Sequence, residues 1–185
     1  MGRTRANLRL FVAVYPPQEI ARALLETLGG LQLPPHRLVR SDQVHLTLHF
    51  IGDTLVTGLQ AAIETVQRAA GGLPPFELLP RRVISLPQRG RARLVAAETD
   101  SPPTLIELQR RLATRLARQP RRTPSDRFRP HLTLCRFKAP AAIRAVDLSI
   151  AVPSFAVPRI VLMRSTLASD GAQHDEVASC PLVAV

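Results

Sequence analysis

The chain has 185 residues, of which 45% are hydrophobic and 21% are charged. This composition is typical of a globular protein with one core or two small fused lobes, and no apolar run is long enough to span a bilayer. The two cysteines, Cys135 and Cys180, are too few for a disulfide scaffold or a zinc cage. We therefore expect a cytoplasmic protein with reduced thiols and no membrane partner.

The first half of the chain alternates patterns typical of strands and helices. In chain order they predict a strand over 8–14, a helix between Pro17 and Gly29, a strand over 44–52, a helix over 55–70, and short strands at 76–80 and 82–86. The doubled proline at Pro16 and Pro17 marks the start of the first helix. Because the opening run contains Arg9 and stops before this proline pair, it is a poor signal peptide.

The second half repeats the opening order of the first. Its patterns predict a strand over 91–99, a helix after Pro103, a strand over 130–137, at most a short helix over 141–146, and strands over 149–155, 159–165 and 175–185. The tetrapeptide His-Leu-Thr-Leu occurs in both halves. Pro17 lies 28 residues before His45, and Pro103 lies 28 residues before His131 (45 − 17 and 131 − 103). The match of motif, order and spacing indicates an internal duplication.

The duplication predicts the fold class. We expect an α+β, bilobal fold in which two duplicated lobes, related by a pseudo-twofold axis, each pack helices on an antiparallel sheet. Residues 1–185 would form a single domain of two intimately packed repeats, approximately 1–90 and 91–185 in sequence order. Such an axis would bring the two histidine strands together and place an active site in the central cleft.

The repeated motif predicts paired histidine and threonine side chains in this cleft. Side chains alternate between the faces of a strand, so His45 and Thr47 share one face, and Phe50 lies on the other face with the leucines. In the same way His131 and Thr133 share a face. Because the unperturbed pKa of histidine is about 6.5, one ring can be neutral while the other is protonated. Two such rings suit acid–base cleavage of a phosphodiester, with the hydroxyls bound to its non-bridging oxygens.

Other uses of these histidines fit the sequence less well. Ordinary core histidines would not account for the matched motif, order and spacing. His49 also lies on the His45 face, but four residues along a strand span about 13 Å, which is too far to share one metal ion. Neither motif contains an acidic residue that could complete a metal site. We therefore expect no metal and no cofactor, with His49 at the rim of the cleft and the place of His174 left open.

The formal net charge of +11 indicates an anionic partner. Its excess comes from arginines in two regions, residues 81–93 and 110–129, and such a field attracts RNA or DNA. The other interpretation, that a genome favouring arginine codons decorates solvated faces in this way, stays open. With six phenylalanines, one tyrosine and no tryptophan, a stacking platform for long single strands is not expected. A small anionic target fits better.

The motif blocks resemble those of the 2H phosphoesterases, and among them the RNA 2′,3′-cyclic phosphodiesterases, also called 2′–5′ RNA ligases, of the ThpR/LigT type. The similarity covers nearly the whole chain and rests on RLFVAV at 9–14, VRSDQVHLTLHFIGD at 39–53, RFRPHLTLCRF at 127–137 and IVLMRSTLASDGAQHDEV at 160–177. It implies a bilobal enzyme that hydrolyses a terminal RNA 2′,3′-cyclic phosphate to a 2′-phosphate. The reverse reaction would ligate RNA ends, such as tRNA halves, through a 2′–5′ linkage.

The resemblance also assigns roles to residues. The implied catalytic set is His45, Thr47, His131 and Thr133. Within it, His45 would protonate the leaving 3′-oxygen and His131 would activate water. Arg136 matches a phosphate-binding arginine after the second motif, although strict alternation puts it on the leucine face, so it contributes only if the strand bulges or ends there. Phe11 would line the base-binding end or belong to the core.

The chain departs from the family pattern where substrate contacts are expected. It has no aromatic residue before the first motif, and Gln173 and His174 stand where typical members have a tyrosine after Gly-Ala. The main hypothesis is a monomeric, metal-independent enzyme acting on RNA with a 2′,3′-cyclic phosphate terminus. Two alternatives remain open: the same chemistry on a small cyclic phosphate or 2′–5′ oligonucleotide, and a non-catalytic RNA-binding module.

Overall fold

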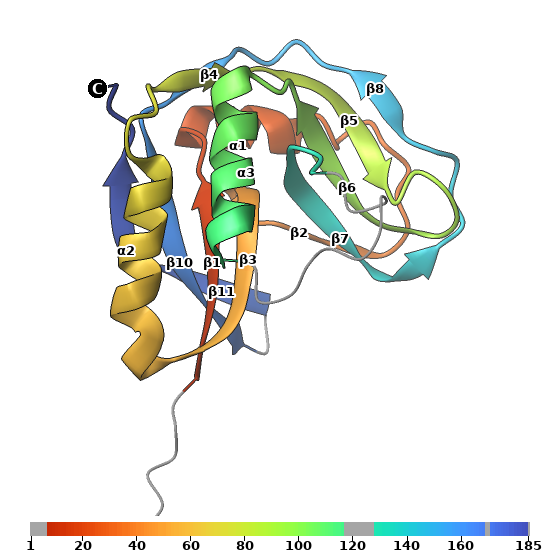
Figure 1. Ribbon diagram of the computed structural model, residues 1–185. Helices are drawn as coiled ribbons and strands as arrows, with labels where there is room; N and C mark the ends of the chain where they lie inside the picture. Colours follow the sequence, from red (N-terminus) through yellow and green to blue (C-terminus); the bar gives the residue numbers. More distant parts are fainter. Residues whose placement is uncertain (1–6, 117–127, 169–170, 185) are drawn as a thin grey trace, which may run out of the picture.

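The computed structural model describes residues 7–116, 128–168 and 171–184 (Figure 1). Its α-helices are α1 (Gln18–Glu26), α2 (Leu59–Ala70) and α3 (Pro103–Leu116). Its strands are β1 (Asn7–Val14), β2 (His36–Leu38), β3 (Leu46–Leu55), β4 (Phe76–Leu78), β5 (Pro80–Leu86), β6 (Ala92–Thr99), β7 (His131–Ala141), β8 (Asp147–Ser149), β9 (Phe155–Val157), β10 (Arg159–Ala168) and β11 (Gly171–Pro181). The predicted α+β class is confirmed. No helix in the described ranges is both long enough and apolar enough to cross a membrane.

Nine of the strands form one antiparallel sheet. Its order is β11-β10-β1-β3-β7-β6-β5-β8, and β2 pairs with β7 beside this path. The two histidine strands, β3 and β7, lie next to each other at the centre and pair at Leu46 and Leu132. The expected bilobal arrangement is therefore two half-sheets that join along these strands.

The order of the elements follows the predicted duplication. The elements β1, α1 and β3 correspond to β6, α3 and β7, and each histidine strand pairs with the first strand of its own repeat. However, β5 pairs with β6, and β10 pairs with β1, so each half-sheet contains strands from both repeats. The half-sheets therefore do not coincide with the predicted repeats 1–90 and 91–185. For β5 and β6 the cause is local, because antiparallel strands joined by a short connection pair as a hairpin.

The helices pack on one face of the sheet (Figure 1). Buried residues of the sheet and of all three helices form the main core there, among them Leu46, Leu48, Leu132, Leu134, Leu24, Val66 and Leu108. Side chains alternate along β1, so Leu10 and Val12 enter this core while Phe11 and Ala13 face away from it, into a small second cluster. This second face of the sheet carries the histidines.

The short helix predicted over residues 141–146 is absent: apart from Ala141, which ends β7, the segment has no regular secondary structure. Six residues are too few to offset the cost of nucleating a helix without strong tertiary contacts. Here the contacts favour an extended backbone, because the Ser85 N–H donates to the Val146 carbonyl and the Val146 N–H donates to Ser85 Oγ, both at 3.1 Å. The segment thus leads directly into the edge strand β8.

Candidate active site

The central strands bring the two motifs together. Because Leu46 and Leu132 pair and are both fully buried in the main core, their neighbours along each strand lie on the opposite face. These neighbours are His45, Thr47, His131 and Thr133, all of them half-buried. The two histidines are close enough for the charge of a protonated His131 to lower the pKa of His45. The expected meeting of the two motifs at the centre of the fold is therefore seen.

Both histidine rings are held in the same way. Nδ1 of His45 lies 2.7 Å from the Gln43 carbonyl oxygen, and Nδ1 of His131 lies 2.8 Å from the Arg129 carbonyl oxygen. A carbonyl only accepts hydrogen bonds, so each Nδ1 must carry the proton and donate it. In a neutral ring Nε2 is then the unprotonated nitrogen. Each ring thus keeps Nε2 to accept a proton or, once protonated, to donate one.

Burial and positive charge make both imidazoles less basic than usual. Burial, opposed by the bond to Gln43 and assisted by the charges of His174, Arg136 and His131, lowers the pKa of His45 to about 4. The pKa of His131 is also lowered, again mainly by burial. Both rings are therefore neutral at neutral pH in the free protein. An anion bound beside them would favour the protonated form of either ring.

A bulge in β7 turns Arg136 toward the histidines. Thr133 pairs with Ala96, but Cys135 pairs with Val95, so Leu134 is an extra residue in β7. After it the alternation is reversed: Leu134 and Cys135 are both buried, and Arg136 is exposed. From the sequence, Arg136 is expected to reach the histidine face only if the strand bulges, and β7 does bulge at this point. The positive charge of Arg136 lowers the pKa of His45 and of His131.

The same irregularity occurs in β3. Thr47 pairs with Ala13, but His49 pairs with Val12 of the main core, so Leu48 is the extra residue. The expectation that His49 shares the His45 face is wrong for this reason. The expectation that Phe50 lies on the leucine face is also wrong. Phe50 is 67% exposed, and its ring centroid lies 6.1 Å from that of Phe11, which faces away from the main core.

Aromatic and imidazole rings surround His45. Its ring centroid lies 5.2 Å from Phe11, 5.3 Å from Tyr15 and 4.9 Å from His174. Phe11 is only 3% exposed, whereas Phe50 beside it is 67% exposed, so Phe50 presents the accessible aromatic surface. The sequence reasoning missed Tyr15, although Phe11, Ala13 and Tyr15 follow the strict alternation of β1. His174, left open from the sequence, belongs to this group.

A hydrogen bond joins Tyr15 to His174. The pKa of Tyr15 is raised by burial and by the nearby carboxylates Asp42 and Glu176, so its phenol stays protonated. The Tyr15 hydroxyl and His174 Nδ1 share this hydrogen bond at a distance of 3.4 Å. The pKa of His174 is lowered, mainly by burial. Tyr15 directly follows β1 and His174 lies in β11, so the two side chains come from distant parts of the chain and both contact His45.

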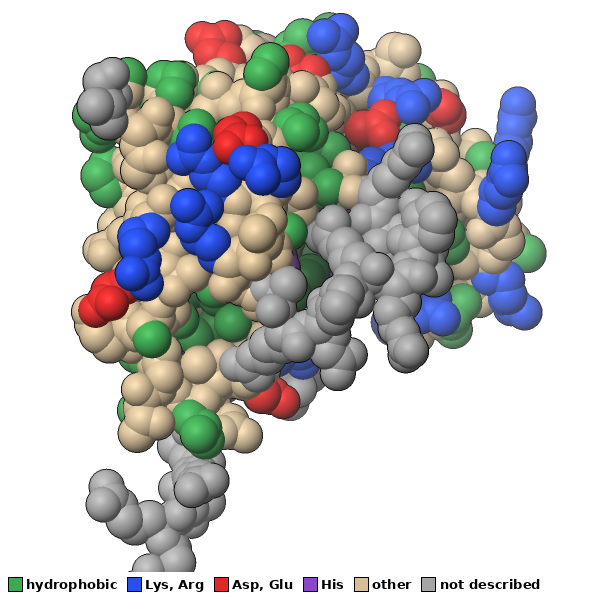
Figure 2. Space-filling model, in the orientation of Figure 1, with side chains coloured by type: hydrophobic (Ala, Val, Ile, Leu, Met, Phe, Trp, Pro, Cys, Tyr) green, Lys and Arg blue, Asp and Glu red, His purple; other side chains and the backbone are tan. Residues whose placement is uncertain are grey.

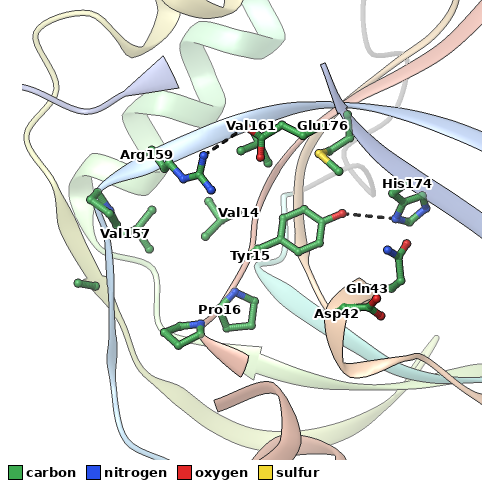
Figure 3. Close-up of a pocket in the computed structure, with 14 residues that line it drawn as sticks. Val14, Tyr15, Pro16, Asp42, Gln43, Val157, Arg159, Val161, His174 and Glu176 are labelled. Atoms are coloured by element: carbon green, nitrogen blue, oxygen red, sulfur yellow. Dashed lines mark hydrogen bonds and ion pairs between the residues drawn. The ribbon is translucent and has the colours of Figure 1, made fainter. Parts of the chain in front are cut away.

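A cavity of about 600 Å³ lies beside this pair (Figure 3). Its walls combine apolar side chains with a polar rim that includes Tyr15, Asp42, Gln43, Arg159, His174 and Glu176. Arg159 and Glu176 form an ion pair at 3.2 Å across the rim. The volume is within the range of small-molecule sites, and the cavity is lined by two of the rings that contact His45.

Positive charge also gathers away from the histidines. Figure 2 shows a group of basic side chains over α2 and α3, on the helix-covered face. Part of the arginine-rich run 110–129, residues 117–127, lies outside the described residues.

In the described ranges, no group of three or more histidine, cysteine, aspartate or glutamate side chains is arranged to hold a metal ion.

Comparisons with known proteins agree on one family. A family model described as the 2′-5′ RNA ligase superfamily matches residues 16–167. The chain is 34% identical over 146 residues to an RNA 2′,3′-cyclic phosphodiesterase of Thermus thermophilus, which covers 72% of this chain and 71% of that protein. It is 29% identical over 141 residues to a protein of the same name from Methanothermobacter thermautotrophicus, with 73% and 76% covered.

Solved structures show the same fold. A crystal structure of a protein from Thermus thermophilus has a TM-score of 0.77 at 28% identity and covers 94% of this chain and 97% of that one. A crystal structure of E. coli LigT complexed with 3′-AMP has a TM-score of 0.76 at 27% identity, with 95% and 98% covered.

Proposed function

The chain belongs to the 2′-5′ RNA ligase superfamily, and from this premise we propose that it hydrolyses RNA 2′,3′-cyclic phosphate ends to 2′-phosphates by two-histidine acid–base catalysis. The observation that carries the proposal is the arrangement of His45, directly before β3, and His131, the first residue of the adjacent antiparallel strand β7. In each ring Nδ1 is bound to a carbonyl and Nε2 is left for a ligand. Its relatives are named RNA 2′,3′-cyclic phosphodiesterases, which supports the same reaction.

In the proposed reaction the cyclic phosphate lies between the two rings. The hydroxyls of Thr47 and Thr133 and the guanidinium of Arg136 donate hydrogen bonds to its non-bridging oxygens, where negative charge builds up. Neutral His131 takes a proton from water through Nε2 as the water oxygen bonds to phosphorus. Protonated His45 gives its Nε2 proton to the 3′-oxygen as the P–O3′ bond breaks. The products are a 3′-hydroxyl and a 2′-phosphate, and one proton has moved from His45 to His131.

Substrate charge supplies the protonation state that this reaction needs. Both histidine pKa values are lowered in the free protein, so the acid must gain its proton when substrate binds. A phosphodiester monoanion placed beside the rings stabilises one imidazolium and raises the pKa of the pair. The pair then titrates as a unit with two macroscopic pKa values, rather than one for each residue.

The nucleoside of the RNA end fits the β1 side of the histidines. Phe50 offers an exposed ring for a base to stack on, and the buried ring of Phe11 lies 6.1 Å from it. The cavity beside Tyr15 and His174 adds room for the nucleoside. Base–aromatic stacking contributes about 1–3 kcal/mol per base. Phe11 thus supports the base-binding end in this proposal.

The same site can also ligate RNA ends, and in a single chain. If the 5′-hydroxyl of a second RNA replaces water, the same two proton transfers join two ends, such as tRNA halves, through a 2′–5′ linkage. One chain supplies both histidines, both threonines and Arg136, which supports a monomer as the active form. Size-exclusion chromatography with light scattering during turnover tests this part of the proposal.

The test is an assay in EDTA with two substrates, an RNA with a 2′,3′-cyclic phosphate end and a 2′,3′-cyclic mononucleotide. Turnover of the RNA to a 2′-phosphate product is expected. Turnover of the mononucleotide alone would instead indicate a small cyclic phosphate as substrate. Binding of the RNA without turnover would overturn the proposal in favour of an RNA-binding module. A 3′-phosphate product would contradict the proposed cleavage at the 3′-oxygen.

A further inference from the structure

The two histidines occupy equivalent positions but have different neighbours. Ala13 of β1 pairs with Thr47, and Ala96 of β6 pairs with Thr133. Two residues after each of these alanines, Tyr15, just past the end of β1, stacks on His45, whereas Glu98 of β6 pairs with His131. The duplication therefore holds for the histidines and threonines, but not for the side chain that faces each histidine from the neighbouring strand. This difference gives His131 an acidic neighbour that His45 lacks.

Glu98 is tied to two arginines. Its Oε2 accepts from Arg82 Nε at 2.6 Å, and its Oε1 accepts from Arg129 Nε. Arg82 also contacts Asp147 of β8, at 3.0 Å. The Glu98 side chain is only 17% exposed. Burial alone would raise its pKa, but the hydrogen bonds from Arg129 and Arg82 outweigh this and lower it, so the carboxylate is charged.

The ion pair with Arg129 leads directly to the catalytic ring. The carbonyl of Arg129 is the acceptor that binds Nδ1 of His131. Glu98 fixes the side chain of the same residue from the adjacent strand, so it holds this carbonyl in place. A shift of the carbonyl would release the ring and change which nitrogen carries the proton.

Glu98 also offsets positive charge at His131. The charged and titratable groups that face His131 are Arg129 and Arg136 of its own strand region, Glu98 of β6 with Arg82 and Asp147 beyond it, and His45 across the site. Arg129 and Arg136 lower the pKa of His131, and Glu98 raises it. Without Glu98, the two arginines would leave the ring still harder to protonate.

We propose that Glu98 is a positioning residue for His131: it anchors Arg129, whose carbonyl orients the ring, and neutralises the arginine charge beside the ring. This inference rests on the proposed function for its effect on catalysis, but its effect on the titration of His131 does not depend on any substrate. Tyr15, at the matching position, gives His45 packing without charge.

The test compares variants with opposite effects on charge. Glu98→Gln keeps the shape of the side chain and removes its charge, and Arg129→Gln removes the cation. NMR titration of the His131 ring in the free protein is expected to move to lower pH by about one unit in Glu98→Gln. It is expected to move to higher pH in Arg129→Gln, because that cation lowers the pKa. A merely structural role would not give shifts of opposite sign.

Controls and kinetics complete the test. Asp147→Asn removes the other carboxylate on Arg82 and is expected to leave the His131 titration unchanged. In Glu98→Gln, kcat on the cyclic-phosphate RNA is expected to fall about 10-fold, and Glu98→Asp, which keeps the charge, should recover most of it. Shifts of the same sign in Glu98→Gln and Arg129→Gln, or no shift in either, would overturn the inference. Should wild-type protein fail to turn over the RNA, the proposed function fails, while the titration still decides the role of Glu98.

Discussion

Phe50 and Arg136 occupy equivalent positions in the two repeats, each five residues after its histidine and each turned by a one-residue bulge onto the histidine face. Because β3 and β7 are antiparallel, the two side chains lie toward opposite ends of the catalytic centre. A phosphate held between the histidines would have an aromatic ring toward one end and a guanidinium toward the other. In the proposed reaction, the duplicated strand would thus provide two different substrate contacts from one backbone irregularity.

Removing either histidine is expected to abolish most of the activity. His45→Ala and His131→Ala should each lower kcat on cyclic-phosphate RNA by about 10²–10⁴-fold, because each removes one partner of the proton transfer. Both residues lie outside the main core, so circular dichroism should show native folding. Thr47→Val and Thr133→Val should cost less than the histidine variants. Wild-type turnover by either folded histidine variant would contradict paired acid–base catalysis.

A modified leaving group should distinguish the acid from the base. A substrate in which sulfur replaces the leaving 3′-oxygen needs little protonation as the bond breaks. With this substrate, the rate loss of His45→Ala should shrink by at least about 10-fold, while the loss of His131→Ala should remain. The measurement is single-turnover hydrolysis of the two substrates by each variant. Rescue of His131→Ala instead would reverse the assigned roles.

Acidification is expected to destabilise the fold between pH 6.5 and about 4. The pKa of His45 falls from 6.5 to about 4 on folding, so in this window the unfolded chain binds a proton that the folded protein does not. The stabilisation is therefore present above pH 6.5 and declines on acidification, by at most about 1.4 kcal/mol per pH unit for one group. The lowered pKa of His131 acts in the same direction.

Urea unfolding at several pH values between 4 and 7 measures this effect. His45→Gln removes the titrating group and should give a flatter dependence of the unfolding free energy on pH. An unchanged slope in that variant would show that His45 does not carry the effect.

Loss of Arg136 should weaken catalysis and make His45 more basic. Arg136→Gln removes a donor to the phosphate and is expected to lower kcat/KM by about 10–100-fold. The His45 pKa should rise, because the positive charge of Arg136 lowers it. Arg136→Lys should restore the charge effect on His45 more fully than kcat/KM, since lysine cannot bind two oxygens with one planar group. Arg93→Gln, at an exposed arginine of β6, is the matched control, and an equal loss there would refute the specific role of Arg136.

Phe50 should affect substrate affinity more than the chemical step. Phe50→Ala is expected to raise KM for a cyclic-phosphate RNA about 10-fold with kcat little changed, because it removes a stacking surface worth about 1–3 kcal/mol. Phe50→Tyr should behave like the wild type. Val183→Ala trims another exposed apolar side chain, 61% exposed near the end of the chain, and should leave KM unchanged. A KM for Phe50→Ala equal to that of the control would place the base elsewhere.

Local patterns in the sequence were sufficient to identify the repeat and to predict the reacting groups. Two copies of His-Leu-Thr-Leu at matched distances from a doubled proline predicted that His45 and His131 lie on equivalent strands. Strand alternation then predicted that the histidines and threonines lie on the face opposite the buried leucines. The pattern of buried residues confirms this alternation up to Thr47 in β3 and Thr133 in β7, where the bulges begin. These features depend only on neighbours along the chain, so the sequence alone determines them.

The tertiary structure decided what surrounds the histidines. The bulges at Leu48 and Leu134 depend on the register with β1 and β6, and they reverse the faces of His49, Phe50 and Arg136. Tyr15 and His174 meet across 159 residues, and Glu98 reaches His131 only through the pairing of β6 with β7. Strand register and packing between distant segments arise from the whole sheet, and no periodicity along one strand encodes them. For this reason the proposed reacting groups could be predicted from the chain, while the side chains that surround them required the fold.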